Sequence, residues 1–332
     1  MNQGAFALCA FSKSVSVSPA RAPGIESGTD RAQRPAADTG LTVPFHFFCT
    51  HHLSMNAQSE KAERFRALHA NTATWVIPNP WDAGSAGILS GLGFFALATS
   101  SAAAAIGAGR RDGGLTRETA LAHAKLIVEA TDLPVSADLE NGFGDSPADV
   151  AETIRAAAAT GLVGGSIEDA CGERAEPVYT LEFAVERIRA AVAAARALPF
   201  PFVLTARAEN FIRGKPDLDD TIRRLQAYEE AGADVLFAPG LPDLSAIKRV
   251  CSSVSRPVNF MAGIPGKSFT VAELAAAGVR RISLGASLHR LALGALMNAA
   301  TEIRDGGTFN YTAALPPLPK VYAAMKLTTP SL

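Results

Sequence analysis

The sequence predicts an α/β protein whose eight parallel strands close into a (β/α)8 barrel of the TIM type. Two observations lead to this fold class. From Thr74 onward, short runs of strand-forming residues alternate with Ala-rich helical stretches, which is typical of repeated strand–helix units. Several helical stretches also end at a glycine directly before the next strand, namely Gly161, Gly232 and Gly278. Eight such units fit a closed barrel better than an open doubly wound sheet.

The strand candidates are short and regularly spaced. They cover residues 74–78, 94–99, 134–139, 164–168, 202–207, 234–238, 257–261 and 281–285. The helical stretches between them include 116–130, 147–160, 181–197, 218–231 and 270–277. The alternative, an open sheet, should carry a glycine-rich phosphate loop, and no G-x-G-x-x-G follows any of these strands.

One long uncharged segment could be mistaken for a membrane span. Residues 83–109 carry no charged side chain, which is enough length to cross a bilayer. Six glycines interrupt this segment, together with several serines and threonines. We therefore expect a helix, a glycine turn, a buried strand and a loop, and no membrane partner.

The chain divides into three parts by composition. Residues 1–54 are rich in Ser, Pro and small polar residues without helical or strand periodicity, so we expect a disordered leader or an over-extended reading frame that starts at Met55. Residues 55–305 are expected to form the catalytic barrel. Residues 306–332 contain the segment PPLP and are predicted to be an extended tail on the surface or on a partner subunit.

Charge and cysteine content exclude several classes of function. The 332 residues contain 31 Lys and Arg against 32 Asp and Glu, so the near-neutral chain has no electrostatic reason to bind nucleic acid or an anionic membrane. The four cysteines are scattered without a C-x-x-C pair, which argues against a disulfide framework or a structural zinc site. No charged segment precedes the apolar stretch near the N-terminus, so we expect a cytoplasmic protein.

Acidic residues gather at the predicted carboxyl ends of neighbouring strands, where barrels carry their chemistry. Asp138 and Glu140 end one strand, Glu168 ends the next, and Arg207 and Glu209 end the following one. Residues at i and i+2 of a strand point to the same face, so each pair can face the barrel mouth. Three converging carboxylates repel one another unless a cation or proton intervenes, and oxygen-only ligands suit Mg²⁺ or Mn²⁺.

Other polar residues near these ends have simpler interpretations. Asp82 precedes a helix and is expected to be its N-cap. Asp169 follows Glu168 and has the opposite orientation, so we expect a structural role or a loop anchor. The strand-end acids could themselves be capping or ion-pair residues, although acids on two neighbouring strands beside an arginine favour a site. No lysine lies at a strand end, which argues against a Schiff-base aldolase.

Six motifs in order make the chain recognisable. They are NPWDAGSA (79–86), GFFALATSSAAAAIGAGRRD (93–112), SADLENGFGD (136–145), SIED (166–169), TARAENF (205–211) and AYEEAGAD (227–234). Together they resemble the isocitrate lyase / phosphoenolpyruvate mutase superfamily, which includes methylisocitrate lyase and carboxyvinyl-carboxyphosphonate phosphorylmutase. The resemblance extends from about Asn79 to Leu296, nearly the whole predicted barrel.

The resemblance implies a Mg²⁺-dependent enzyme that acts on small 2-oxo or 2-hydroxy carboxylates. Its metal is held directly or through water by the acids that correspond to Asp138, Glu140 and Glu168. The resemblance also assigns roles to residues that would meet the substrate. The substrate carboxylate is bound by the positions that match Ser100, Ser101 and Ala102, Arg207 contacts substrate oxygens with Glu209 beside it, and Asp112 is a further catalytic position.

The loop after residue 168 departs from the family pattern. Lyases of isocitrate and methylisocitrate carry Lys-[Lys/Arg]-Cys-Gly-His there, whereas this chain has Cys171-Gly172 without the basic pair or the histidine. Cys171 is therefore either incidental or a catalytic acid in a shifted register. The Lys-Thr-Asn-type loop of phosphonate enzymes is absent, and Pro239-Gly240 replaces a histidine of the phosphonate mutases.

These observations favour a lyase that cleaves a C–C bond of a small carboxylate through a metal-stabilised enolate. A phosphonate mutase or hydrolase that breaks a P–C bond is the alternative within the superfamily. A catalytically silent barrel that only binds a carboxylate metabolite is the alternative of another class, and the complete set of acids argues against it.

The last helical stretch suggests an assembly. Residues 291–301, LALGALMNAAT, carry no charge, whereas an outer barrel helix normally has a polar face. We therefore expect this helix to be buried between subunits of a homo-oligomer, most simply a tetramer. The family resemblance adds that this eighth helix is often exchanged between subunits.

Overall fold

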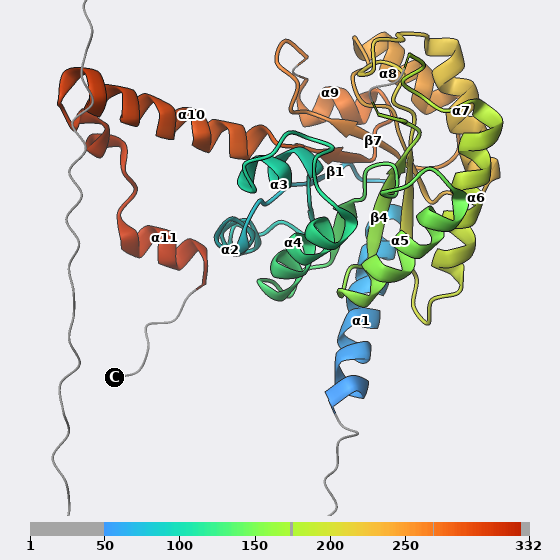
Figure 1. Ribbon diagram of the computed structural model, residues 1–332, viewed down its shortest axis with the longest axis horizontal. Helices are drawn as coiled ribbons and strands as arrows, with labels where there is room; N and C mark the ends of the chain where they lie inside the picture. The colour runs from blue at the N-terminus through green and yellow to red at the C-terminus, as the bar shows by residue number, and fades with distance from the viewer. Residues whose placement is uncertain (1–49, 173–174, 268, 327–332) are drawn as a thin grey trace, which may run out of the picture. The chain divides into compact units, whose positions relative to one another are not determined.

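A computed structural model describes residues 50–172, 175–267 and 269–326, so residues 1–49 of the leader expected at 1–54 lie outside them. Figure 1 shows the strands surrounded by helices. The strands pair in parallel in the order β1-β8-β7-β6-β5-β4-β3-β2. The strands are β1 (Trp75–Ile77), β2 (Leu97–Ala98), β3 (Val135–Asp138), β4 (Gly164–Glu168), β5 (Val203–Arg207), β6 (Val235–Phe237), β7 (Val258–Met261) and β8 (Arg281–Ser283). Each lies within a predicted run, so the predicted barrel is confirmed.

The two ends of the sheet meet at β1 and β2. The N–H of Ala98 in β2 donates a 3.0 Å hydrogen bond to the carbonyl of Pro78, directly after β1. This contact brings the carboxyl ends of the eight strands around one nearly closed ring. Side chains from all parts of the sequence can therefore share a single mouth.

The outer helices cover the five predicted stretches, and a further helix forms at residues 101–107, where a loop was expected. They include α2 (Ala83–Gly91), α3 (Ser101–Gly107), α4 (Arg117–Glu129), α5 (Pro147–Ala159), α6 (Leu181–Arg196), α7 (Leu218–Glu230), α8 (Leu244–Ser252) and α9 (Val271–Ala276). Asp82 caps α2 by accepting the N–H of Ser85, which confirms its expected role. Residues 83–109 form α2, β2 and α3, and no described helix combines the length and apolarity that a membrane crossing needs.

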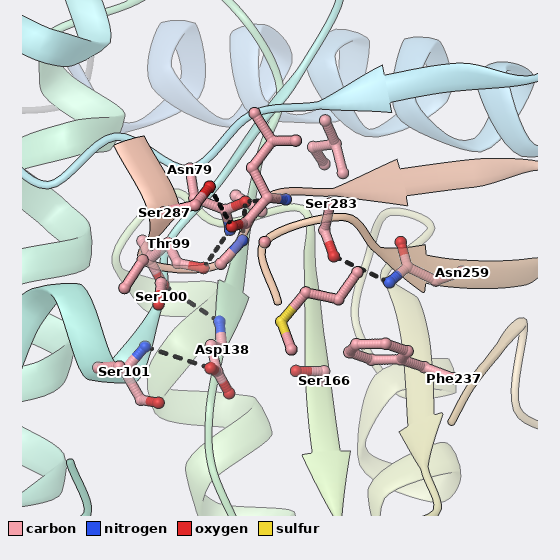
Figure 2. A pocket seen from close by; sticks show the side chains of 18 of the residues that line it. Asn79, Thr99, Ser100, Ser101, Asp138, Ser166, Phe237, Asn259, Ser283 and Ser287 are labelled. Atoms are coloured by element: carbon pink, nitrogen blue, oxygen red, sulfur yellow. Dashed lines mark hydrogen bonds between the residues drawn. The ribbon is translucent and has the colours of Figure 1, made fainter. Parts of the chain in front are cut away.

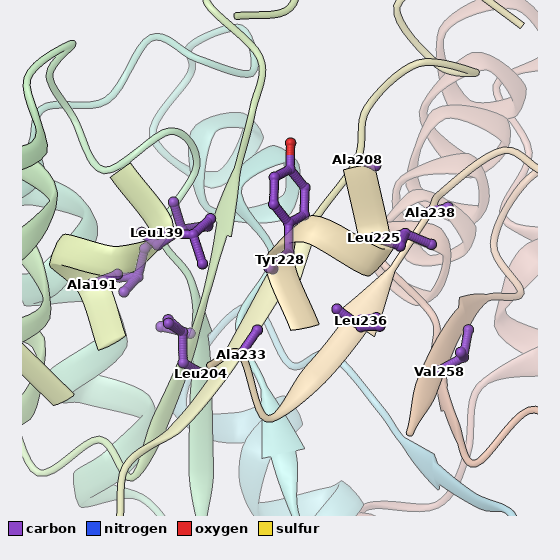
Figure 3. Close-up of a cluster of buried hydrophobic side chains, with 14 of the residues drawn as sticks. Leu139, Ala191, Leu204, Ala208, Leu225, Tyr228, Ala233, Leu236, Ala238 and Val258 are labelled. Atoms are coloured by element: carbon purple, nitrogen blue, oxygen red, sulfur yellow. The ribbon is translucent and has the colours of Figure 1, made fainter. Parts of the chain in front are cut away.

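The main core lies between the strands and the outer helices. Figure 3 shows part of it, where Leu225 and Tyr228 of α7 pack near Leu204 and Leu236 of the sheet. All four side chains are fully buried. The amino-terminal end of the barrel is closed by α1 (Thr50–Ala70), whose Phe65 joins an apolar cluster with residues at the starts of several strands. Residues 50–54, predicted as leader, are thus part of a helix.

The chain after β8 forms an arm. Helix α10 (Ser287–Thr301) begins with His289 stacked on Trp81 and then projects from the barrel (Figure 1). It continues through a π-helical turn (Glu302–Gly306) and a 3-10 helix (Asn310–Ala314) into α11 (Leu318–Ala324). The predicted extended tail is therefore partly helical, because α11 packs on α2 where a Cβ at Gly91 would collide with the carbonyl of Ala324.

Candidate functional site

A cavity of about 350 Å³ opens at the carboxyl ends of the strands, and all eight strands contribute to its walls (Figure 2). Ser100 comes from the loop after β2, Ser101 and Ala102 from the start of α3, and Asp112 from the segment after α3. Asp138 and Arg207 line the cavity from β3 and β5. The cavity therefore lies where the sequence places the chemistry of a barrel.

Arg207 is the centre of the charged groups at this mouth. Its Nη1 lies 2.8 Å from Asp138 Oδ1, its Nη2 3.1 Å from Glu168 Oε2 and its Nε 3.0 Å from Glu209 Oε1. The guanidinium also lies over the ring of Phe237, 5.2 Å from its centroid. Because Arg207 is buried and touches three carboxylates, neighbouring negative charges raise its pKa well above the usual value against the opposing effect of burial.

Asp138 connects this charged group to the loop after β2. Its Oδ2 accepts the backbone N–H of Ser101 at 3.2 Å, and its own N–H donates to Thr99 Oγ1 at 3.1 Å (Figure 2). Ser100 caps α3 by accepting the N–H of Ala103. These bonds hold the start of α3 beside the carboxylate of β3.

Glu140 reaches the same region in an unexpected way. Strand β3 ends at Asp138, and Glu140 adopts a left-handed backbone with φ of 50°, so strand alternation does not set its direction. Its pKa is nevertheless raised to about 8, first by burial and then by the negative charges of Asp138, Asp112 and Glu168. The ionisation of Glu140 is thus opposed by three neighbouring carboxyl groups as well as by burial.

The chemistry of this donor set fits a hard divalent cation. Oxygen ligands with excess negative charge suit Mg²⁺ or Mn²⁺. Across the described ranges, no three His, Cys, Asp or Glu side chains are already grouped as metal ligands. The reason is visible at Arg207 and Arg213, which bind the two oxygens of Glu168 at 3.1 Å each. A cation would compete with these arginines for the same oxygens, and binding by Asp138, Glu140 and Glu168 stays a prediction.

Four predicted site residues do not line the cavity, namely Glu140, Glu168, Glu209 and Cys171. Glu209 has no exposed surface and contacts Arg207, while Arg213 Nε lies 3.8 Å from its other oxygen. Cys171 is also buried, and its Sγ donates to the carbonyl of Glu176 at 2.8 Å. Neither residue lines the cavity, so the structure brings both near the mouth without exposing them to it.

Asp169 is confirmed as a structural anchor. Its carboxylate accepts the hydroxyl of Tyr228 at 2.6 Å, the guanidinium of Arg224 at 3.1 Å and the backbone N–H of Glu209 at 2.9 Å. These bonds join the ends of β4 and β5 to α7. Its neighbour Glu168 points to the opposite side, as the alternation of a strand requires.

The sequence analysis missed the polar side chains below the mouth. Ser136, Ser166 and Thr205 line the cavity, and each lies two residues before a charged strand end that was recognised. The cavity also includes Asn259 of β7 and Arg281 of β8. Side chains two residues apart on a strand share a face, so the residues two positions before Asp138, Glu168 and Arg207 could have been recognised as facing the cavity. These residues are Ser136, Ser166 and Thr205.

The chain is a (β/α)8 barrel with a cavity and clustered charged side chains at the carboxyl ends of its strands, which is where enzymes of this fold carry their active sites. Comparison with known families identifies the one to which it belongs. The model of the phosphoenolpyruvate phosphomutase family matches residues 65–304, so the chain belongs to this family within the isocitrate lyase / phosphoenolpyruvate mutase superfamily. Members of this superfamily catalyse lyase or mutase reactions, and the protein is an enzyme of this kind.

Individual relatives agree with this assignment. The 2-methylisocitrate lyase of Halalkalibacterium halodurans is 31% identical over 76% of this chain and 85% of its own length. A solved structure from Burkholderia cenocepacia J2315, provisionally described as a lyase or mutase, is 55% identical with a TM-score of 0.78 and covers 80% of this chain and 95% of that one. Oxaloacetate acetylhydrolase in complex with its product oxalate is 26% identical with a TM-score of 0.73, over 81% and 95% of the two chains.

Proposed function

We propose that this protein is a lyase that cleaves a C–C bond of a small 2-oxo or 2-hydroxy carboxylate. The observation that carries the proposal is the buried guanidinium of Arg207, which lines the cavity within hydrogen-bond distance of Asp138, Glu168 and Glu209. The similarity to 2-methylisocitrate lyase and to oxaloacetate acetylhydrolase supports C–C cleavage of this substrate class.

The substrate carboxylate would bind between β2 and the first turn of α3. Ser100, Ser101 and Ala102 line the cavity there, and backbone N–H groups are suitable donors to a carboxylate. The N–H of Ser101 donates to the carboxylate of Asp138, so a substrate carboxylate would share or replace this hydrogen bond. Asp112 lies across the same cavity and would face the bound substrate.

The residues that would hold Mg²⁺ or Mn²⁺ are Asp138, Glu140 and Glu168. A divalent cation supplies Lewis-acid stabilisation of negative charge on substrate oxygens. Burial, and then the negative charge of neighbouring groups, raises the pKa of Glu140, and added positive charge would relieve that repulsion.

Arg207 supplies the fixed positive charge of the reaction. Cleavage of a C–C bond next to a carboxylate leaves negative charge on the fragment that keeps the bonding electrons. A buried guanidinium held by Asp138 and Glu209 is already oriented toward the cavity, so little reorganisation is needed when that charge develops. Glu209 acts through Arg207, because its carboxylate is buried behind it.

We expect small substrates to be turned over better than isocitrate or methylisocitrate. The loop from Ala170 to Pro177 carries Glu173 and Glu176, and close carboxylates repel in a partly desolvated site. Cys171→Ser should retain at least about a tenth of the rate, because its thiol binds a backbone carbonyl and does not line the cavity. A screen of 2-oxo and 2-hydroxy mono-, di- and tricarboxylates with Mg²⁺, using both proteins, measures these expectations.

The opposite result of this screen would change the role assigned to the loop that carries Cys171. Efficient turnover of isocitrate or methylisocitrate together with an inactive Cys171→Ser protein would make Cys171 the general acid in a shifted register. Cys251→Ser is the matched control, since Cys251 lies in α8, outside the cavity. It should leave the rate unchanged whichever interpretation holds.

Cleavage of a P–C bond is the second candidate, and the family model itself favours it, because its description is a phosphoenolpyruvate phosphomutase. The same anionic cavity would receive a phosphonate beside the carboxylate. Including phosphonopyruvate in the screen separates the two candidates, since a lyase would leave its P–C bond intact.

The proposal includes a homo-oligomer in which α10 contacts a partner. Leu291, Leu296 and Met297 are 73%, 63% and 63% exposed, and large exposed apolar surfaces typically mark interfaces. The exchange of this helix between subunits of a tetramer is the arrangement that the resemblance implies.

A cytoplasmic location is also part of the proposal, in keeping with the free thiols of Cys171 and Cys251.

The oligomer can be tested by changing α10. Light scattering at micromolar concentration should show an assembly for the intact chain and a smaller species for the double variant Leu296→Glu, Met297→Glu, because buried unpaired charges destabilise an interface. Leu126→Glu on α4 is the control, since Leu126 is 59% exposed but lies outside this arm. A monomeric intact chain would contradict the proposal.

A further inference from the structure

The interior of the barrel is polar and incompletely filled below the charged mouth. Barrel interiors are normally packed with bulky branched side chains. Here the small residues Ser136, Ser166 and Thr205 occupy inward positions on three neighbouring strands, and the cavity extends between them. On the other side it meets Asn259, whose Nδ2 donates to Ser283 Oγ at 3.0 Å (Figure 2). The cavity therefore has a polar floor inside the barrel.

Arg281 brings a positive charge to this floor. It lines the cavity and is only 6% exposed. Its Nε donates to Asn259 Oδ1 at 2.8 Å, its Nη2 to Thr205 Oγ1 at 3.0 Å, and its Nη1 contacts His69 Nε2 at 3.1 Å. A guanidinium has five N–H groups, so these three contacts leave donors available for a ligand.

No described carboxylate forms an ion pair with Arg281, and the partners named above are neutral. Burial and the charge of Arg281 lower the pKa of His69 to about 3, so its imidazole carries no charge at neutral pH. The pKa of Arg281 is lowered to about 9 by burial alone. Arg207, by contrast, is held by three carboxylates. A buried charge without a counter-charge is costly, which favours an anion beside it.

We propose that Arg281, Asn259 and Thr205 form an anion subsite that receives the second carboxylate of a dicarboxylate substrate. Thr205 precedes Arg207 by two residues on β5, so the two levels lie about 6.6 Å apart along the strand. A short carbon chain spans this distance, with its first carboxylate near Ser101 and Arg207. The inference rests on the proposed function and narrows its substrate class to dicarboxylates.

Malate and lactate provide a matched pair of probes, since both are 2-hydroxy acids and malate has one more carboxylate. Calorimetric titration of the Mg²⁺-loaded chain should show malate binding at least about tenfold more tightly than lactate, the size expected for a charge-assisted hydrogen bond. Arg281→Met should reduce this preference to less than about threefold and leave lactate affinity nearly unchanged. Arg187→Met, which removes a buried arginine outside the cavity, should preserve the preference.

Asn259→Asp provides a second variant that does not remove the buried charge. An aspartate there would give Arg281 an internal counter-charge, so the melting temperature should rise and the preference for malate should disappear. A malate preference that survives in both Arg281→Met and Asn259→Asp would overturn the inference. If chloride alone raises the melting temperature of the intact chain while malate and lactate bind equally, the subsite holds an adventitious ion only, and the inference also fails.

These binding measurements test the anion subsite independently of the proposed lyase reaction. An Arg281-dependent preference without any turnover of dicarboxylates would support the subsite and contradict the lyase proposal. Turnover of a dicarboxylate with a preference that does not depend on Arg281 would support the lyase and contradict the subsite.

Discussion

Replacing Arg207 by alanine should reduce kcat/KM at least about a thousandfold for any substrate that the intact protein turns over. The reason is that the same guanidinium faces the cavity and bridges Asp138, Glu168 and Glu209. Stability should also fall, by about 3–5 kcal/mol, because the variant leaves buried carboxylates without their partner. Steady-state kinetics and urea unfolding measure the two effects separately.

Two further variants separate catalysis from folding. Arg207→Lys keeps a positive charge but replaces the planar guanidinium, whose three nitrogens each reach a different carboxylate, by a single nitrogen, so it should restore much of the stability and little of the activity. Arg196→Ala removes an exposed pair with Asp234 and should change both quantities only slightly. If Arg207→Ala remains folded and retains more than about a tenth of the activity, Arg207 is not the group that stabilises the developing charge.

Removing divalent metal should abolish activity, and adding Mg²⁺ or Mn²⁺ should restore it. A metal that binds the folded state at a hundred times its Kd stabilises it by about 2.7 kcal/mol, so the melting temperature of the intact protein should rise on addition. Asp138→Ala should show no such rise, because it removes one of the three proposed ligands. Differential scanning calorimetry with and without EDTA measures the effect.

A matched acid on the surface provides the control for this experiment. Glu152 is exposed on α5 and pairs with Arg155, so Glu152→Ala should respond to the metal like the intact protein. Equal responses in the intact protein and Asp138→Ala, or no response in either, would contradict the metal site. Activity that persists in EDTA would contradict the proposed role of the metal.

Predictions based on local patterns agreed closely with the structure. The strands are shorter than predicted by one or more residues, except β4, but every predicted strand is present. Gly161, Gly232 and Gly278 have φ of 94°, 101° and 100° after their helices. Such conformations favour glycine, so the ends of these helices could be recognised locally.

Predictions that depended on which way a side chain points were less reliable. Glu140 was expected to share the face of Asp138, yet β3 ends at Asp138 and a left-handed residue follows. Glu209 was expected at the mouth, and it is buried behind Arg207 instead. Strand alternation loses its meaning once the strand has ended, and a sequence does not mark that point within two residues. The C-terminal tail was predicted to be extended, but part of it is helical, because α11 is stabilised by packing on α2, which is distant in the sequence.

The sequence by itself determined the barrel, the family and the charged groups at the mouth. Periodicity and helix-end signals depend on a few neighbouring residues, so they can be recognised in the sequence. The order of the motifs along the chain indicates which strands end in acidic residues. Only the tertiary structure decided that Arg207 binds Asp138, Glu168 and Glu209 together, and that Arg281 meets His69, Asn259 and Thr205 from three other elements. Which charge is neutralised and which stays unpaired depends on distances across the closed barrel, and no local pattern encodes those distances.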